Sequence, residues 1–489
     1  MAVDVSSDRT FEEARHWLNE CGSTHHGNAT CPPLEEHILP TRLVDVGDAM
    51  VSPSLHISDK GQRGHYAALS YVWGGQQTYQ TTMDTISEKV NGMPIAKLPK
   101  TIQDAIIVTR QLRIKYLWVD VFCIIQDSEE DKSQEIARMA ETFKNSVFTI
   151  SASTSKSAEA GFLEDRPRPQ AIRFPFHTTG DREGTVSLIL DEWIMNFQDG
   201  CATESRAWCF EEALLPSRRL VYGPRELQWV CKAYPLGRTV EPSHIHSRGL
   251  YGMLPLRTWD TTKPLVDDDR VQWTSYVTEY NRRSLTKSKD RANAILGVAQ
   301  VLSKLWNEDY IHGCFVQHLS WQLHWAVPTW ARSKPSVIDV PSWSWLSVER
   351  ADFDRSSIMY TMAECVLDAE KQLDQLRSGI LTLKAQVCSF KQLTMAGEDM
   401  WTFLMDGEDN FRAAADGAKA VLVGRRHGKE CCGILVKPSL EGRFRRVGYF
   451  ETMAGKDGQP GHKTPDEYWP GSEFYWPNKL STEIQITLE

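Results

Sequence analysis

The stretch from Tyr66 to Asp127 constrains the fold of this chain more than any other feature. Two short apolar runs, at residues 66–74 and 116–125, each end in small or polar residues, and a segment with helical periodicity lies between them. This order is typical of a strand–helix–strand unit in an α/β sheet. Such proteins place their binding and catalytic groups at the carboxyl ends of the strands. The sequence therefore predicts a functional site beside these two strand ends.

The same alternation continues to residue 153. A helix is expected over residues 98–112, a second helix over Lys132–Asn145, and a third buried strand over residues 147–153. Strand, helix, strand, helix, strand predicts a parallel sheet with right-handed crossovers. The predicted fold class is α/β, a parallel sheet flanked by helices, followed by a mixed α+β C-terminal region.

The length of 489 residues exceeds what one compact core accommodates, so several domains are expected. We predict an N-terminal lead-in helix and strand at 1–50 and the α/β domain at 51–235. A mainly helical extension at 236–355 and a β-rich region at 356–489 follow. No apolar run approaches the roughly 20 residues that a membrane helix needs, and the polar N-terminus lacks a signal-peptide core. These features predict a cytoplasmic protein without a membrane span.

The formal net charge of -9 argues against a nucleic-acid partner, because binding to phosphates requires a basic surface. No Ser-His-Asp triad, HExxH, CxxC pair or GxGxxG motif is visible, so protease and dinucleotide-fold functions gain no support. No cofactor is implied by these patterns.

Two cysteines and two histidines lie close together near the N-terminus, at Cys21, His25, His26 and Cys31. Thiols and imidazoles are the ligands that zinc prefers. Their spacing fits no standard zinc finger, and an ordinary loop is the favoured interpretation. The sequence leaves metal binding by these residues open, and no metal site is assigned.

Several ordered blocks of this chain resemble the HET domain, the heterokaryon-incompatibility domain of filamentous fungi. They lie at residues 66–74, 98–105, 116–127 and 206–219. The resemblance implies a cytoplasmic fungal protein of non-self recognition that triggers programmed cell death when incompatible strains fuse. It implies self-association, or an allelic or non-allelic fungal protein, as the partner.

The order of elements also resembles a TIR domain, to which HET domains are linked by fold. Some TIR domains cleave the nicotinamide–ribose bond of NAD with a glutamate that stands four residues after a tryptophan on a helix. Trp208 and Glu212 have this spacing, which implies that Glu212 is catalytic, that Trp208 contacts substrate and that NAD is a candidate substrate. The structural alternative is that Glu212 pairs with Arg206, Arg218 or Arg219. Glu211 is expected to face solvent.

Asp120 stands where the second strand is expected to end, and a charge inside this apolar run needs a partner. We therefore predict a catalytic or supporting role for Asp120. Candidate substrate-binding residues are Ser70, Tyr71, Trp73, Gly74 and Gln126. An ordinary strand-to-loop turn with two core aromatic residues explains the segment around Gly74 equally well.

Two other functions remain open. HET-like proteins that stand alone also occur in fungal secondary metabolism, where a tailoring enzyme or cyclase with an aromatic site and carboxylates would suit acid-assisted cyclisation. The third is a non-catalytic interaction module, in which Asp120 and Glu212 are structural. Whether the chain is an enzyme, and on which substrate, is not decided by the sequence.

Overall fold

A computed structural model describes most of the chain. The described residues are 4–23, 31–48, 50–166, 171–177, 183–189, 201–224, 226–234, 238–239, 267–328, 336–353, 364–365, 368–369, 373–395, 401–406, 417–426, 430–439, 442–452 and 482–489. The chain divides into two compact units, Met1–Trp259 and Asp260–Glu489, which are described separately. The division into four parts predicted from the sequence stays a prediction.

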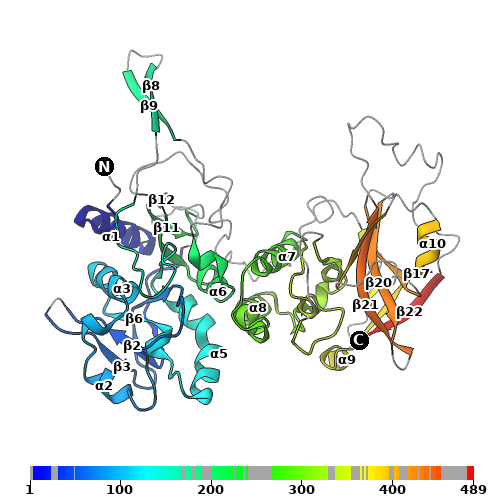
Figure 1. The fold of residues 1–489 in the computed structure, drawn as a ribbon, viewed down its shortest axis with the longest axis horizontal. Coiled ribbons are helices and arrows are strands. Elements are labelled where there is room, and N and C mark those ends of the chain that lie inside the picture. Colours follow the sequence, from blue (N-terminus) through cyan, green and yellow to red (C-terminus); the bar gives the residue numbers. More distant parts are fainter. Residues whose placement is uncertain are drawn as a thin grey trace. The chain divides into compact units, whose positions relative to one another are not determined.

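The N-terminal unit alternates strands and helices as predicted (Figure 1). Its helices are α1 (Asp8–Gly22), α2 (Ile86–Asn91), α3 (Lys100–Gln111), α4 (Asp120–Cys123), α5 (Glu129–Asn145) and α6 (Cys209–Leu214). Its strands are β1 (His37–Ile38), β2 (Arg42–Asp45), β3 (Ser54–Ile57), β4 (Arg63–Gly64), β5 (Tyr66–Ser70), β6 (Tyr116–Trp118), β7 (Thr149–Ser151), β8 (Ala171–His177), β9 (Glu183–Ile189), β10 (Arg218–Tyr222), β11 (Leu227–Cys231) and β12 (Arg238–Thr239).

Eight of these strands form one sheet in the order β12-β11-β10-β7-β5-β6-β2-β3. The four central strands, β10, β7, β5 and β6, run parallel. The outer strands join them antiparallel, as β2 does on β6 and β11 does on β10. The predicted α/β class is confirmed, and the sheet is mixed because short connections such as that between β10 and β11 return the chain antiparallel.

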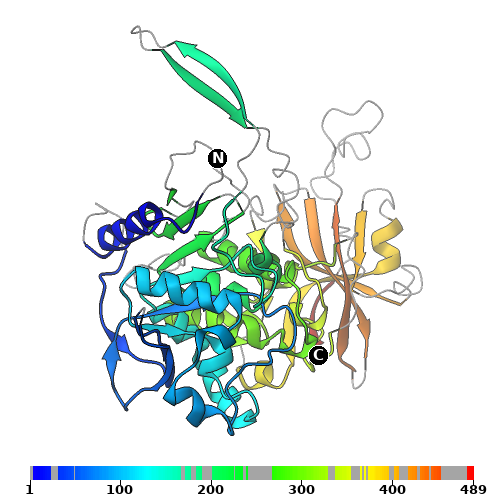
Figure 2. The same cartoon turned by 60° about the vertical axis from the view of Figure 1, so that its left-hand side comes forward.

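The two faces of the sheet are covered by different helices (Figures 1 and 2). Ala67 and Leu69 of β5, Leu117 of β6 and Ile150 of β7 share a core with α1 and α3. Successive strand residues point to opposite faces, so the alternate positions face the other way. On that second face Trp118 packs edge-to-face on Phe143 of α5, with ring centroids 5.4 Å apart.

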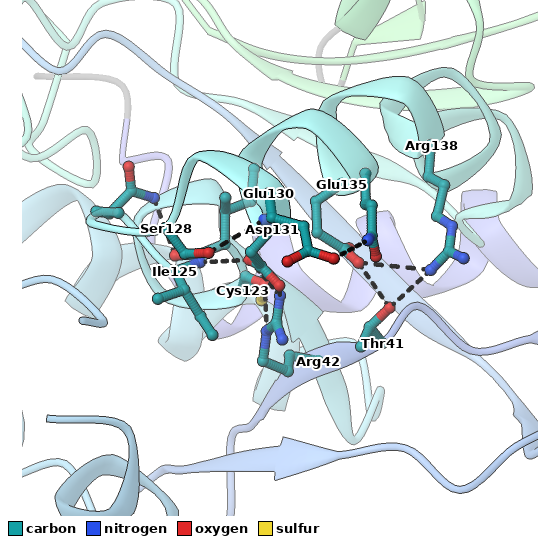
Figure 3. Close-up of polar contacts among 12 residues, drawn as sticks. Thr41, Arg42, Cys123, Ile125, Ser128, Glu130, Asp131, Glu135 and Arg138 are labelled. Atoms are coloured by element: carbon teal, nitrogen blue, oxygen red, sulfur yellow. Dashed lines mark hydrogen bonds and ion pairs between the residues drawn. The ribbon is translucent and has the colours of Figure 1, made fainter. Parts of the chain in front are cut away.

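An ion pair between buried Arg42 and partly buried Asp131 fixes the segment that carries α4 and the start of α5 (Figure 3). Arg42 of β2 donates to both carboxylate oxygens of Asp131, at 2.7 and 2.6 Å, and its Nε donates to the Cys123 carbonyl at 2.7 Å. Asp131 Oδ2 also accepts from the Ile125 N–H at 2.7 Å. Because α4 begins at Asp120, these contacts determine where the chain that bears Asp120 lies.

The C-terminal unit combines helices with a second, largely antiparallel eight-stranded sheet. Its helices are α7 (Asp267–Asn281), α8 (Asn293–Trp306), α9 (Leu373–Arg377) and α10 (Phe390–Met395). Its strands are β13 (Tyr310–Ile311), β14 (Cys314–Phe315), β15 (Glu364–Cys365), β16 (Asp368–Ala369), β17 (Leu381–Ser389), β18 (Trp401–Met405), β19 (Lys419–Arg426), β20 (Glu430–Pro438), β21 (Phe444–Thr452) and β22 (Thr482–Leu488). Strand β17 pairs with both β22 and β19, so five strands of this sheet form a closed circuit. The predicted β-rich C-terminal region is confirmed.

Among the described residues, no helix is both long enough and apolar enough to cross a membrane.

We expect Asp131→Ala to lower the free energy of unfolding of the N-terminal unit by about 3 kcal/mol, because the buried Arg42 guanidinium loses its counter-charge. Lys132→Ala is the control, since its ion pair with the exposed Glu129 is expected to contribute at most about 0.5 kcal/mol. Urea unfolding of both variants measures the difference. Equal losses in the two variants would contradict an anchoring role for Arg42 and Asp131.

Candidate functional site

Polar residues stand at the ends of β5, β6 and β7, on the face of the sheet that α5 and α6 cover. Ser70 is the last residue of β5, Ser151 is the last residue of β7, and Asp120 follows β6 after one intervening residue. Because β5, β6 and β7 are parallel, their carboxyl ends meet at one edge of the sheet. Polar residues thus share the edge at which the sequence predicts a functional site, and a function for them stays a prediction.

Helix α6 brings Glu212 to this edge by packing against β5 and β7. The Ser70 hydroxyl donates to Glu212 Oε2 at 2.5 Å, and Glu212 is only 8% exposed. Trp208 is the N-cap of α6 and has helical backbone angles, so it lies one turn before Glu212 as the spacing predicts. Helix α6 ends at Leu214, and strand β10 begins at Arg218.

Asp120 is held by two donors from different elements. Trp73 Nε1 donates to Asp120 Oδ2 at 2.7 Å, and the Val121 N–H donates to Oδ1 at 2.7 Å. Asp120 and Trp73 are half-buried, as are Arg206 and Trp208, so this side of the cluster retains exposure to solvent. The partner that a charge at Asp120 requires is thus the indole of Trp73, with the backbone of α4.

The two carboxyl groups influence each other. Burial, with a smaller contribution from the negative charge of Asp120, raises the pKa of Glu212 to about 7, although the Ser70 hydroxyl and Arg206 oppose the shift. Burial likewise raises the pKa of Asp120, and the hydrogen bonds from the Trp73 indole and the Val121 N–H oppose the shift. Like charges that sit close together disfavour ionisation of both groups. Glu212 is therefore poised to exchange a proton near neutral pH.

Tyr71 lies beside both carboxyl groups. Its pKa is raised well above the ordinary value, first by burial and then by the charges of Asp120 and Glu212. A phenol with such a pKa keeps its proton and acts as a donor. The structure therefore brings Ser70, Tyr71, Trp73, Asp120 and Glu212 together, while substrate contact by any of them stays a prediction.

Gln126 and Gly74 have structural roles. The Gln126 amide donates to the carbonyls of Asp120 and Ile124, at 3.1 and 3.0 Å, and so holds α4. Gly74 has a φ of +75°, and an added Cβ would lie 2.2 Å from Ser157 Cβ. Only glycine fits this position without displacing its neighbour. Their predicted roles in substrate binding stay predictions.

Sequence reasoning missed part of this edge. Arg206 was considered only as an ion-pair partner of Glu212, yet its charge acts on Glu212, Asp120 and Tyr71 alike. A chain of hydroxyls also joins Ser151 to Ser153 at 3.0 Å and Ser153 to Thr203 at 3.2 Å. The rule that polar groups follow strand ends would have found the two serines.

The expectation that Glu211 faces solvent was wrong. Glu211 is only 3% exposed, and helix α6, which carries it, packs against β5, β7 and α5. Of the three arginines that the structural alternative names as partners of Glu212, Arg218 is engaged elsewhere, since its Nε donates to Cys21 Sγ at 3.2 Å.

The N-terminal cysteines have an unforeseen neighbour. The sulfur atoms of Cys21, Cys31 and Cys231 all lie within 4.8 Å of one another, an arrangement that could hold a metal ion. His25 and His26 lie outside the described residues. Cys231 ends β11, about 200 residues from the other two cysteines, so no local spacing could reveal it.

A comparison with family models identifies residues 66–212 as a match to the heterokaryon incompatibility protein (HET) family. The match begins at the first residue of β5 and ends at Glu212, so it spans β5, β6, β7 and the candidate site. The resemblance stated from the sequence is confirmed over this range. Comparisons with curated proteins and with solved structures gave no match.

We expect Gly74→Ala to lower the free energy of unfolding by about 2 kcal/mol, because alanine is strained at this φ and its Cβ overlaps Ser157. The adjacent Gly75→Ala is a matched control with open space around its Cβ, expected to change stability by less than about 1 kcal/mol. Thermal or urea unfolding compares the two. Identical behaviour would mean that the loop after β5 relaxes freely.

A stability measurement tests the raised pKa of Glu212. The folded-state pKa of about 7 exceeds the ordinary value of 4.5, so the folded protein binds more protons and its stability falls as pH rises between these values. Glu212→Gln removes this loss. Its stability relative to the wild type should therefore grow by about 2 to 3 kcal/mol from pH 5 to pH 8.

Urea unfolding at both pH values measures this growth, with Glu130→Gln, which changes an exposed carboxyl group, as the matched control. A difference between Glu212→Gln and the wild type that does not change with pH would show that Glu212 titrates alike in the folded and unfolded chain.

Proposed function

We propose that this chain, which carries a HET domain over residues 66–212, acts in heterokaryon incompatibility as a fungal effector that triggers programmed cell death by cleaving NAD. The observation that carries the proposal is the contact of Ser70 with the buried Glu212, one helical turn from Trp208 and electrostatically coupled to Asp120. A carboxylate beside an indole is the arrangement that the resemblance to TIR domains implies for cleavage of the nicotinamide–ribose bond.

The proposed reaction breaks the bond between ribose C1′ and the pyridinium nitrogen. Nicotinamide leaves as a neutral molecule with the bonding electron pair, so the leaving group needs no proton. Positive charge develops on the ribose, and the Glu212 carboxylate stabilises it. Water then adds its oxygen to C1′ and releases a proton, which gives ADP-ribose.

The other groups of the cluster have supporting roles in this proposal. Ser70 fixes the direction of the Glu212 carboxylate through Oε2. Asp120, oriented by Trp73, accepts a hydrogen bond from a ribose hydroxyl. Tyr71 remains a neutral donor. Trp208 is half-buried and provides an aromatic surface for the nicotinamide ring.

We further propose that activity requires self-association, or binding to an allelic or non-allelic fungal protein, in the cytoplasm. Clustering by such a partner would remove water from the half-exposed side of the cluster, where Asp120 and Arg206 lie. Removal of water strengthens the electrostatic interactions at that side. The assignment of the segments around 51–235 to the effector domain is part of this proposal.

A second candidate function is that of a tailoring enzyme or cyclase in secondary metabolism. It is favoured by one observation, namely that a carboxyl group with a pKa of about 7 is largely protonated below neutral pH and can donate a proton to a substrate. The two functions require opposite protonation states of Glu212. The direction of the pH dependence therefore separates them.

We expect purified protein at high concentration, with a crowding agent, to convert NAD to nicotinamide and ADP-ribose. Glu212→Gln should lower kcat/KM by about 10²-fold or more, because the charge that stabilises the transition state is removed. Glu211→Gln, which changes the adjacent buried carboxyl group, is the matched control and should retain activity. Chromatography of the products measures all three proteins.

The pH profile is the second readout. In the wild type kcat/KM should rise with pH through about 7, since only the ionised Glu212 stabilises the ribosyl cation. Absence of NAD loss in the wild type, or equal loss in Glu212→Gln, would contradict NAD cleavage at this site. Metabolite profiling of a deletion strain would then test the tailoring function.

A further inference from the structure

Three cysteine thiols from distant parts of the chain meet at one point of the N-terminal unit. Cys21 lies in the last turn of α1, Cys31 precedes β1, and Cys231 is the last residue of β11. Their sulfur atoms all lie within 4.8 Å of one another. Figure 1 shows α1 beside β11, and these two elements are in contact.

The distances between the three sulfur atoms are suitable for ligands of a single metal ion. Zinc binds thiolates at about 2.3 Å in tetrahedral geometry, which places neighbouring sulfur atoms about 3.8 Å apart. Three thiols within 4.8 Å need only a small contraction to reach this arrangement. A disulfide would join two of the sulfur atoms at about 2.05 Å and leave the third without a role.

The surroundings supply the charge that a thiolate site needs. Arg218 is 3% exposed, and its Nε donates to Cys21 Sγ at 3.2 Å. Three thiolates and a divalent cation carry a net charge of minus one, which a guanidinium balances. The same Arg218 donates to the carbonyls of Cys21 and Pro32, so it also holds the two chain segments that present Cys21 and Cys31. Donors to the sulfur atoms of metal ligands orient the ligands and tune the site.

Cysteine binds zinc as the thiolate, so binding of the ion releases protons and the affinity for zinc should rise with pH.

The cluster is separate from the candidate catalytic groups. Cys21 and Cys231 belong to the apolar core on the face of the sheet that α1 and α3 cover. Glu212 and Ser70 lie on the opposite face, with α6. A metal ion at the cysteines would thus join the N-terminal helix to the outer strands without touching the substrate.

We propose that Cys21, Cys31 and Cys231 bind one Zn²⁺ ion as thiolates, in a structural site that fastens α1 and the segment before β1 to the end of β11. Each thiol loses its proton to solvent, and no electron transfer is involved. The fourth position of the tetrahedron is open to water or another donor. This proposal does not depend on the proposed function.

The test begins with the metal content of the full chain, purified under reducing conditions without chelator. Mass spectrometry of the metals should find one zinc per chain in the wild type, and at least about tenfold less in Cys21→Ser and in Cys231→Ser. Cys314→Ser is the control, since it removes a buried thiol elsewhere in the chain, and it should retain the zinc.

A second measurement uses only the wild-type protein, so it tests the proposal even where a cysteine variant fails to fold. Wild-type protein stripped of metal and titrated with Co²⁺ should develop the charge-transfer absorption of cobalt thiolates, and Zn²⁺ should abolish it. The stripped protein should also unfold at a lower temperature than the zinc-loaded protein.

Three results would overturn the proposal. They are wild-type protein that shows neither zinc nor a cobalt–thiolate spectrum, zinc retained in both cysteine variants, and a disulfide between two of the three cysteines in protein isolated without oxidant.

Discussion

The parallel pairing of β5 with β6 and β7 is the constraint on which the candidate site depends. The register places Ala68 opposite Trp118 on one side and opposite Thr149 on the other, so the three strands end at the same edge. Alternation then assigns Leu69 and Ile150 to the apolar core and Ser70 and Ser151 to the face of α5 and α6. A shift of one residue in any strand would exchange these faces and bury the polar groups among apolar ones.

The electrostatics of this edge follow from the same geometry. Burial raises the pKa of two carboxyl groups from different elements, and the hydrogen bonds from Ser70 and Trp73 and the charge of Arg206 oppose only part of that shift. Elsewhere in the unit the partly buried carboxylate of Asp131 is matched by the buried guanidinium of Arg42. Asp131 is thus a carboxylate that stabilises the structure, whereas Glu212 and Asp120 are a pair whose environment favours a change of protonation state.

The sequence predicted what depends on local pattern. The strands around Tyr66–Ser70 and Tyr116–Trp118, the intervening helix and the placement of Asp120 at a strand end all follow from short-range periodicity. The α/β class and the β-rich C-terminal region were predicted for the same reason.

What depends on distant contacts was not predicted. The antiparallel outer strands, the burial of Glu211 and the meeting of Cys231 with Cys21 arise from tertiary packing between segments far apart in the chain. Arg218 illustrates the difficulty: its position near Glu212 in the sequence suggested an ion pair, whereas β10 directs its side chain to Cys21 on the other face. No spacing rule along the chain contains that information.

The central claim is that Glu212 and Asp120 form one electrostatically coupled pair. Its most direct test is an NMR titration of the Glu212 carboxyl carbon in protein labelled at glutamate, with Glu212→Gln used to assign the signal. The account predicts a midpoint near pH 7 in the wild type and a lower midpoint in Asp120→Asn, because a negative charge beside Glu212 has been removed. A midpoint near the ordinary value of 4.5, or one unchanged in Asp120→Asn, would contradict the account.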